Sequence, residues 1–208
     1  MTGQRIAAFD FDGTLTKRDT VLPFLVRACG ARAVSRVAAR VAPTGIRGRL
    51  GRLENGLHHR DVVKEALLRE LLAGREASWL AERGADYAET LPGRLRPAMV
   101  SQAQWHREQG HQLVIVSASL HAYLDPFAMK HGFHHVIAVG LATDAAGILT
   151  GALTGPNVRG PEKAVRLGAW LDGKPPEFLW AYGNSSGDSE LLAMADHPVW
   201  VAGPNCVA

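Results

Sequence analysis

The sequence predicts an α/β protein with a three-layer, Rossmann-like core, in which helices cover a parallel sheet and a helical bundle is inserted after the first strand. Two observations predict this fold class. Short apolar runs alternate with longer helical patterns, and one long stretch near the start lacks such a run. At 208 residues, with 47% hydrophobic and 21% charged residues, the chain is long enough for one domain with a small insertion and has a globular composition.

Five short apolar runs bounded by Gly, Asp or Ser predict buried strands. They cover residues 6–9, 113–116, 136–139, 178–182 and 199–201. Helical patterns at 97–109, 120–131, 160–171 and 188–195 separate these runs, as the crossovers of a parallel sheet do. Residues 141–153 have the pattern of a small hairpin that projects from the same sheet.

The stretch from about residue 21 to residue 91 contains no comparable apolar run and indicates several helices, one of them at 61–72. We therefore expect two units. Residues 1–20 and 92–208 would form the core, and residues 21–91 would form a helical insertion.

The net charge of +3 is too small to indicate a nucleic-acid-binding protein, but its distribution is uneven. No acidic residue lies between Asp19 and Glu54, so that segment is strongly basic. Its arginines are Arg27, Arg32, Arg36, Arg40, Arg47, Arg49 and Arg52. Arg32, Arg36 and Arg40 recur every four residues and would form one stripe along a helix, the arginine stripe. A solvated helix face is the favoured explanation, and peripheral contact with an acidic membrane or attraction of an anionic substrate is the alternative.

The sequence also indicates where the protein acts. Its first apolar run, residues 6–9, is too short for the hydrophobic region of a signal peptide. No uncharged apolar stretch approaches the roughly twenty residues needed to cross a bilayer. We therefore expect a cytoplasmic protein without a transmembrane segment. Cys29 and Cys206 are too few for a disulfide framework and are expected to be reduced, with a single bridge as the alternative.

Two carboxylates, Asp10 and Asp12, follow the first predicted strand. Ligands bind at the carboxyl ends of strands in open α/β sheets, so both carboxylates should face that edge. They would point the same way if the strand simply continued, and Gly13 would permit a sharp exit. The competing explanation is an Asp-Gly turn without a ligand.

Further polar residues lie at the ends of later predicted strands or at the start of a predicted helix. Ser117 ends the second strand, where a hydroxyl and free N–H groups suit an anion, although serine is also a common helix cap. Lys163 stands near a helix start, where a cation opposes the helix dipole; an anionic ligand would explain it, and so would a solvated surface position. Asn184 and Asp188 follow the strand at 178–182 and could supply oxygen ligands. The alternative is a Gly/Ser loop in which Asp188 caps the next helix.

These four segments, in this order, resemble the motifs of the haloacid dehalogenase-like superfamily, specifically its phosphoserine phosphatase-like branch. Residues 10–16 match motif one, Ser117 motif two, Lys163 motif three and residues 183–188 motif four. The insertion at 21–91 stands where this branch carries its helical cap, so the resemblance covers essentially the whole chain.

The resemblance implies a Mg²⁺-dependent hydrolase that acts through an aspartyl-phosphate intermediate on a small phosphomonoester. Asp10 would be the nucleophile, and Asp12 the general acid and base. Ser117 and Lys163 would bind phosphate oxygens. The metal ligands would be Asp10, the Asp12 carbonyl, Asn184 and Asp188. Further substrate contacts would come from Gly13, Thr14, Ala118 and Asp19. A carboxylate at position 12 argues against carbon–halogen cleavage, which needs no acid for a halide leaving group.

Two positions bear on metal and substrate. Motif four usually begins with an aspartate, so the neutral amide of Asn184 suggests lower metal affinity. Asp19 lies where phosphoserine phosphatases carry a glutamate that contacts the substrate amine; it would do this or cap the first helix of the insertion. Phosphoserine, other alcohol phosphates and a lipid phosphate head group all stay open as substrates. A phosphotransferase, or a non-catalytic phosphate- or lipid-binding protein with this fold, is the alternative function.

Overall fold

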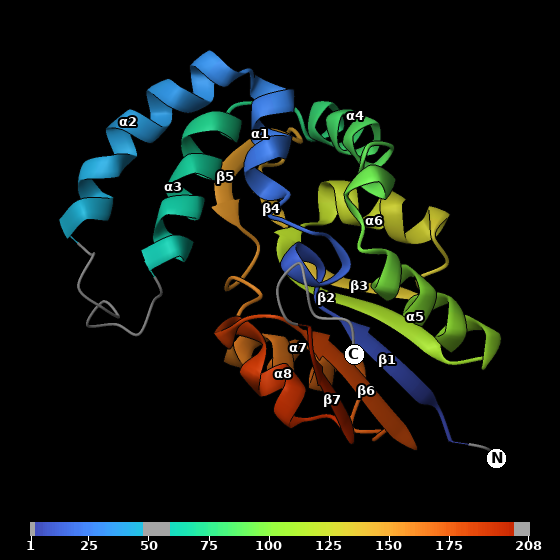
Figure 1. Cartoon of the computed structure of the whole chain (residues 1–208). Helices are drawn as coiled ribbons and strands as arrows, with labels where there is room; N and C mark the ends of the chain where they lie inside the picture. Colours follow the sequence, from blue (N-terminus) through green and yellow to red (C-terminus); the bar gives the residue numbers. More distant parts are fainter. Residues whose placement is uncertain (1–2, 48–58, 202–208) are drawn as a thin grey trace.

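The computed structural model describes residues 3–47 and 59–201, without the side chains of residues 42–47 and 59–60. Its centre is a five-stranded parallel sheet with the strand order β3-β2-β1-β6-β7 (Figure 1). The strands are β1 (Arg5–Phe9), β2 (Gln112–Leu120), β3 (His135–Val139), β6 (Phe178–Gly183) and β7 (His197–Trp200). All five predicted strands and the Rossmann-like fold class are therefore confirmed, with the last strand beginning two residues earlier than expected.

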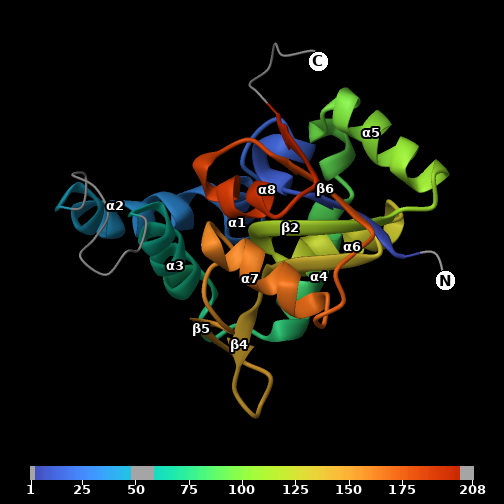
Figure 2. The same cartoon turned by 90° about the horizontal axis from the view of Figure 1, so that it is seen from below.

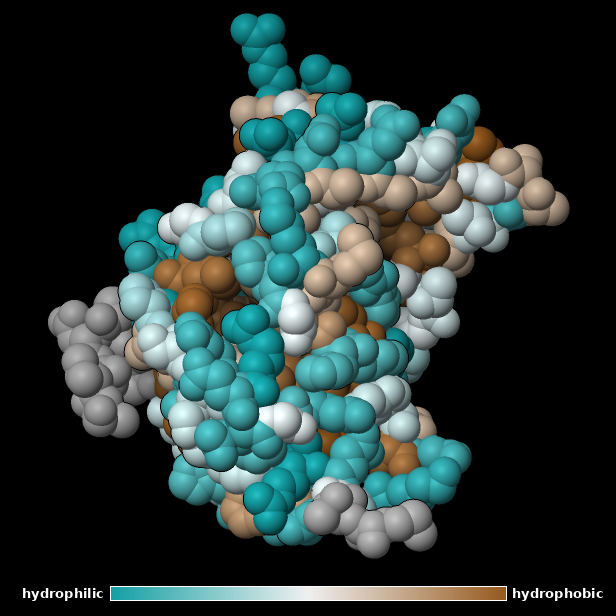
Figure 3. All heavy atoms as spheres, turned by 90° about the vertical axis from the view of Figure 1, so that its right-hand side faces the viewer, coloured by the Kyte–Doolittle hydropathy of each residue, from teal (hydrophilic) through white to brown (hydrophobic). Residues whose placement is uncertain are grey.

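Helices cover both faces of this sheet. Helices α5 (Pro97–Glu108) and α6 (His121–Lys130) lie on one side, and α7 (Pro161–Trp170) and α8 (Ser189–Ala193) on the other (Figure 1). Seen from the α5–α6 side, hydrophilic side chains predominate, and apolar ones appear mainly in recesses between them (Figure 3). The three layers follow from the sequence because a sheet with apolar residues on both faces needs helices on both.

The central strand β1 is buried along almost its whole length. It pairs with β2 and β6, and Ile6, Ala7, Ala8 and Phe9 are all fully buried. Phe9 stacks on Tyr182 of β6 with ring centroids 4.4 Å apart. The chain that follows Phe9 therefore leaves the sheet from a rigidly packed strand.

The stretch between β1 and β2 forms helices, as predicted. They are α1 (Val21–Cys29), α2 (Ala31–Arg47), α3 (His59–Leu72) and α4 (Ala77–Ala88). These helices stand over the carboxyl ends of the strands (Figure 1), and we call them the cap. Helix α4 packs on α6 of the core so closely that a Cβ atom added at Gly84 would lie 1.9 Å from the carbonyl oxygen of Ala122.

The hairpin forms, but it does not project from the central sheet as we expected. Strands β4 (Leu141–Thr143) and β5 (Leu149–Leu153) make a separate antiparallel sheet, and β5 lies beside α3 (Figure 2). Leu149 exchanges backbone hydrogen bonds with the α3–α4 connection, accepting from Gly74 at 2.8 Å and donating to Arg75 at 2.8 Å. The backbone groups of that connection need partners, and the hairpin supplies them.

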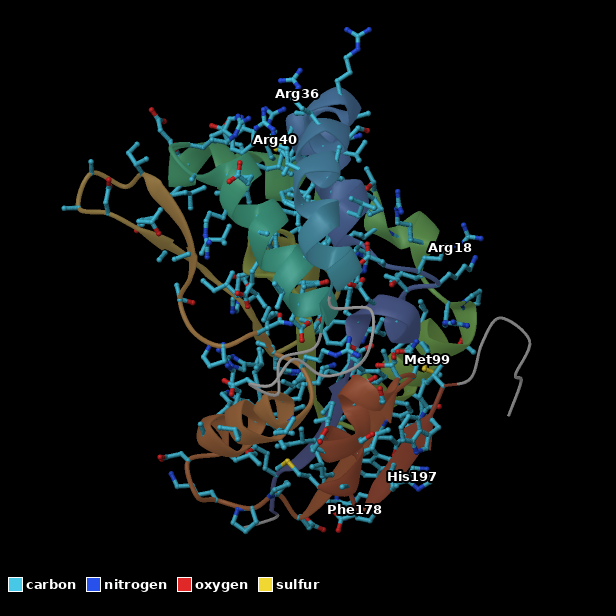
Figure 4. The ribbon with its side chains drawn as sticks, turned by 90° about the vertical axis from the view of Figure 1, so that its left-hand side faces the viewer. Arg18, Arg36, Arg40, Met99, Phe178 and His197 are labelled. Carbon is cyan, nitrogen blue, oxygen red and sulfur yellow. The ribbon has the colours of Figure 1, made fainter. Side chains whose placement is uncertain are left out.

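The arginine stripe lies on the exposed side of α2. Arg36 and Arg40 extend outward from this helix (Figure 4), whereas Val34 and Val37 are buried. Arg49, Arg52 and Cys206 lie outside the described residues, so the expectations about them stay predictions. None of the helices in the described ranges has the length and apolar character that crossing a membrane requires.

Candidate active site

The first motif is a wide turn directly after β1. Asp10 and Asp12 both have extended backbone, and the Thr16 N–H donates to the Phe11 carbonyl at 2.9 Å to close the turn. Gly13 has a φ of +87°, and a Cβ atom there would lie 2.2 Å from Nδ2 of Asn184. The positive φ favours glycine here, and any side chain would displace the Asn184 amide. The strand ends at Phe9 rather than continuing through both aspartates, yet both line one cavity.

Lys163 joins the first motif to the fourth. Its Nζ donates to Oδ1 of Asp10 at 2.6 Å and to Oδ1 of Asp188 at 2.6 Å. Lys163 is only 2% exposed, so the alternative of a solvated surface lysine is wrong. Burial alone would lower the pKa of Lys163, but the two carboxylates raise it above its usual value. The lysine is therefore a fixed cation between two buried carboxylates.

The carboxylate of Asp12 is held between two hydroxyl groups. Oδ1 accepts from Thr20 at 2.6 Å, and Oδ2 accepts from Ser119 at 2.6 Å. Burial, followed by the nearby Asp19 carboxylate, raises the pKa of Asp12 to about 7, although both hydroxyls oppose the shift. A carboxyl group with such a pKa exchanges protons readily near neutral pH.

Two tyrosines hold Thr20 in place, one at its hydroxyl and one at its backbone carbonyl. The Tyr123 hydroxyl lies 3.0 Å from Oγ1 of Thr20, and the Tyr87 hydroxyl donates to the Thr20 carbonyl at 3.0 Å. Tyr87 comes from cap helix α4, so the cap contributes to the support of Asp12. We did not predict Thr20, Ser119 or these tyrosines as site residues. Only Ser119, two residues after Ser117, carried a signal in the sequence.

Asp188 organises the fourth motif. Its Oδ2 accepts from the backbone N–H of Asn184 at 3.1 Å and from the N–H and hydroxyl of Ser185, each at 2.9 Å. Asp188 forms a capping box with Ser185 on the short turn that follows; it also stands at the N-cap position of α8, where its side chain makes no capping bond. The capping alternative is therefore confirmed only for the turn. Lys163 and the Ser185 bonds outweigh burial, which alone would raise the pKa of Asp188, and hold that pKa below its usual value.

A cavity of about 650 Å³ opens between this sheet edge and the cap. Every predicted site residue except Thr14 lines it. Thr14 is fully buried, and its hydroxyl donates to Oδ1 of Asn184 at 3.4 Å, so it supports Asn184 instead of facing a substrate. Oγ of Ser117 accepts from the Ser119 N–H at 3.1 Å, which leaves the Ser117 hydroxyl proton free to be donated.

The cap places one unpredicted cation in the cavity. Lys64 of α3 donates from Nζ to the Ala118 carbonyl at 2.6 Å and to Oδ1 of Asn157. Asn157 in turn donates to Asp61 at 2.6 Å. Burial lowers the pKa of Lys64 to about 8. Nothing in the sequence distinguishes this lysine from a surface residue of an ordinary helix.

Asp19 caps the first helix of the insertion. Its Oδ2 accepts from the backbone N–H of Leu22 at 3.0 Å, which is one of the two roles we considered. The side chain also lines the cavity, so a contact with substrate stays a prediction.

The donor set at the sheet edge suits a hard divalent cation. Among the described residues, no three His, Cys, Asp or Glu side chains gather as a metal cluster, but the expected ligands include an amide and a backbone carbonyl. The Asp10 carboxylate, the Asp12 carbonyl and the Asn184 amide all supply oxygen, which Mg²⁺ prefers. Both oxygens of Asp188 are already engaged, so ligation through water would preserve its contacts, whereas direct ligation would break one.

Comparisons with known proteins agree with this geometry. Residues 7–193 match the family described as haloacid dehalogenase-like hydrolase. Protein CicA of Caulobacter vibrioides is 35% identical over 202 residues, which cover 94% of this chain and 87% of CicA. A solved protein of unknown function from Bordetella pertussis Tohama I is 25% identical, with a TM-score of 0.74 and coverage of 96% of this chain and 90% of that one.

Phosphoserine phosphatases share the same fold. A probable phosphoserine phosphatase from Vibrio cholerae has a TM-score of 0.64 at 19% identity, covering 95% of this chain and 56% of that one. A phosphoserine phosphatase solved as a phospho-aspartyl intermediate analogue has a TM-score of 0.61 at 17% identity, covering 93% and 84%. The chain belongs to the haloacid dehalogenase-like hydrolase family and has the fold of its phosphoserine phosphatase-like branch.

Proposed function

We propose that this protein is a Mg²⁺-dependent phosphomonoester hydrolase that acts through an aspartyl-phosphate intermediate. The observation that carries the proposal is the contrast between the two carboxylates of one cavity. Burial raises the pKa of both carboxyls, but at Asp10 the Lys163 cation opposes this rise, whereas Asp12 lies between two neutral hydroxyls and its pKa rises to about 7. A carboxyl supported by a cation suits a nucleophile, and one supported only by neutral groups suits an acid–base group.

In the first step, we assign the attack on phosphorus to Oδ2 of Asp10, because Lys163 occupies Oδ1. A bond forms between Oδ2 and phosphorus while the bond to the ester oxygen breaks. Protonated Asp12 gives its proton to the leaving alkoxide, so the alcohol departs neutral. The Ser117 hydroxyl and the Lys163 ammonium would stabilise charge on the phosphoryl oxygens.

In the second step, Asp12 acts as a base. Its carboxylate takes a proton from a water molecule as the water oxygen bonds to phosphorus, and the bond to Asp10 breaks. This releases phosphate and restores both carboxyl groups. Bound Mg²⁺, held by Asp10, the Asp12 carbonyl, Asn184 and, through water, Asp188, would reduce the repulsion between carboxylate and phosphate.

The test is phosphate release from an aryl phosphate and a panel of alkyl, amino-acid and sugar phosphates, with and without Mg²⁺. We expect release that depends on Mg²⁺ and is lost in Asp10→Asn. No turnover across the panel would contradict an enzymatic role and favour a non-catalytic phosphate-binding protein. Transfer to an acceptor alcohol without phosphate release would favour a phosphotransferase.

A further inference from the structure

The cavity has a polar end and an aliphatic end. Asp10, Ser117 and Lys163 lie at the sheet edge, where the phosphate would bind. The cap contributes an aliphatic wall, formed by Val21, Leu22 and Leu25 of α1 and Val63 and Leu67 of α3. The substrate's alcohol portion would meet this wall, since it extends from the phosphate toward the cap.

The aliphatic wall is open to the cavity mainly at Leu22, because Val21 and Leu25 are 7% and 1% exposed and also belong to the packing of the cap. Residues four apart on each helix, Val21 with Leu25 and Val63 with Leu67, line the same space. Leu22 is 48% exposed although it lines a concave site. Apolar surface in a concave site of several hundred Å³ is typical of a ligand pocket.

Three polar side chains on the cap side of the cavity, one just before α1 and two from α3, already have partners. Asp19 accepts from Leu22, Asp61 accepts from Asn157, and Lys64 donates to Ala118 and Asn157. Each of these groups keeps room for a further hydrogen bond, so the pairing shows only that they are held in place without a substrate. Lys17, Arg18 and Arg159 also line the cavity without an ion pair to any described residue, and they would attract the phosphate group of any ester.

We propose, on the basis of the function proposed above, that the substrate is a phosphomonoester whose alcohol carries an aliphatic chain close to the ester oxygen. The chain would lie against the wall of α1 and α3 while the phosphate lies between Ser117 and Lys163. Such a molecule is either a free alkyl phosphate or a lipid phosphate presented by a bilayer, and the chemistry that the wall recognises is the same.

The first experiment measures kcat/KM for linear alkyl phosphates from methyl to octyl, below the concentrations at which they aggregate. We expect an increase of about twofold to fourfold per methylene until the wall is covered, since each buried methylene contributes about 0.8 kcal/mol. Phosphoserine and glycerol phosphate should be poorer substrates than hexyl phosphate. A flat series, or a preference for phosphoserine, would overturn the inference.

A binding measurement separates this inference from the proposed function. Titration of the Asp10→Asn protein with the same alkyl phosphates should show affinity that rises with chain length. A binding gradient without turnover in the wild-type protein would support the pocket assignment and contradict the proposed function. Binding without a gradient would contradict the pocket assignment even if small esters are hydrolysed.

Two variants on α1 form a matched pair. Leu22 and Val26 are 48% and 38% exposed, but only Leu22 lines the cavity. Leu22→Ser should lower the ratio of kcat/KM for hexyl phosphate to that for methyl phosphate by about threefold to tenfold. Val26→Ser should leave this ratio unchanged. Equal effects of the two substitutions would contradict the role of the wall.

The source of the chain is tested with long-chain alkyl phosphate embedded in vesicles of zwitterionic lipid. Faster turnover in vesicles than of soluble hexyl phosphate would identify a bilayer lipid, and the reverse would identify a free metabolite. The inference would be overturned if neither the embedded long-chain phosphate nor hexyl phosphate were turned over faster than methyl phosphate.

Discussion

Lys163 donates to Asp10 over 2.6 Å, and both side chains are almost completely buried. The lysine also pairs with Asp188, so one cation serves two buried carboxylates. Lys163→Met would remove the cation that both carboxylates share. We expect a loss of about 3–5 kcal/mol in the free energy of unfolding, because an uncompensated buried charge is strongly unfavourable. Phosphate release should be lost as well.

Urea denaturation at pH 7 and an aryl phosphate assay measure these effects. Lys174→Met is the control, since the Lys174 side chain is 83% exposed and its ion pair is with the equally exposed Asp172. We expect its unfolding free energy to change by less than about 0.5 kcal/mol. A Lys163→Met protein as stable as the control variant would show that the buried carboxylates are protonated or paired in another way.

Ser119→Ala removes one of the two hydroxyls that bind Asp12. Because the Ser119 hydrogen bond stabilises the carboxylate, its loss raises the pKa of Asp12 above the value of about 7. The first step needs protonated Asp12, so the basic limb of the kcat/KM profile should move to higher pH for an alkyl phosphate. We also expect kcat to fall about tenfold, because Asp12 loses part of its orientation.

The pH profile is measured with an alkyl phosphate and with an aryl phosphate, whose better leaving group depends less on the acid. Ser101→Ala, an exposed serine on α5, is the control and should reproduce the wild-type profile. An unchanged basic limb in Ser119→Ala would argue against Asp12 as the proton donor.

Asn184→Asp restores the acidic residue usual at the start of the fourth motif. The new carboxylate would lie in a site that already holds Asp10 and Asp188, so it adds repulsion without metal and a stronger ligand with it. We expect a lower Mg²⁺ concentration at half-maximal activity and a larger rise in Tm on adding Mg²⁺. Equal Mg²⁺ dependence in the two proteins would indicate that Asn184 does not contact the metal.

Sequence and structure differ most where a contact joins distant elements. Asp10 and Lys163 were predictable because each carries a local signal, a carboxylate after an apolar strand and a cation near a helix start. Tyr87 and Lys64 were not, because each lies on a helix whose pattern also suits a surface or core position. Their contacts with Thr20 and Ala118 arise only when the cap closes over the sheet edge.

The hairpin shows the same limit. Its turn residues predicted two antiparallel strands correctly, but its partner was decided by the unpaired backbone of the distant α3–α4 connection. Local periodicity defines an element, whereas the neighbour of a short edge strand depends on which exposed N–H and C=O groups lie within reach.

Gly84 marks the closest approach between the cap and the core. An added Cβ atom would lie 1.9 Å from the Ala122 carbonyl oxygen, a backbone atom that cannot rotate away. Gly84→Ala should therefore separate α4 from α6 and cost about 1–3 kcal/mol of stability. Gly168→Ala in α7 is the matched control, because nothing lies within 4 Å of its added Cβ atom. The control should gain about 0.5–1 kcal/mol. Equal melting temperatures of the two variants would contradict the tight contact.

A buried histidine pair lies beneath the site. Nδ1 of His106 is 2.8 Å from Nδ1 of His111, and Nε2 of His106 is 2.8 Å from the Tyr182 hydroxyl. Two ring nitrogens this close cannot both carry protons, so at least one imidazole is neutral. Burial, with a smaller contribution from His111, lowers the pKa of His106 to about 4.

This low pKa predicts acid sensitivity. His106 stays neutral in the folded protein but gains a proton near pH 6.5 when unfolded, so protons favour the unfolded state below that pH. The contribution of neutral His106 to the free energy of unfolding is complete above about pH 6.5. It is lost as the pH falls toward 4, and the total loss is about 3 kcal/mol. Urea denaturation at pH 7, 6 and 5 should show a steeper loss in the wild-type protein than in His106→Gln. His121→Gln, at a partly exposed histidine, should keep the wild-type slope. The same slope in all three proteins would show that the pair does not govern acid stability.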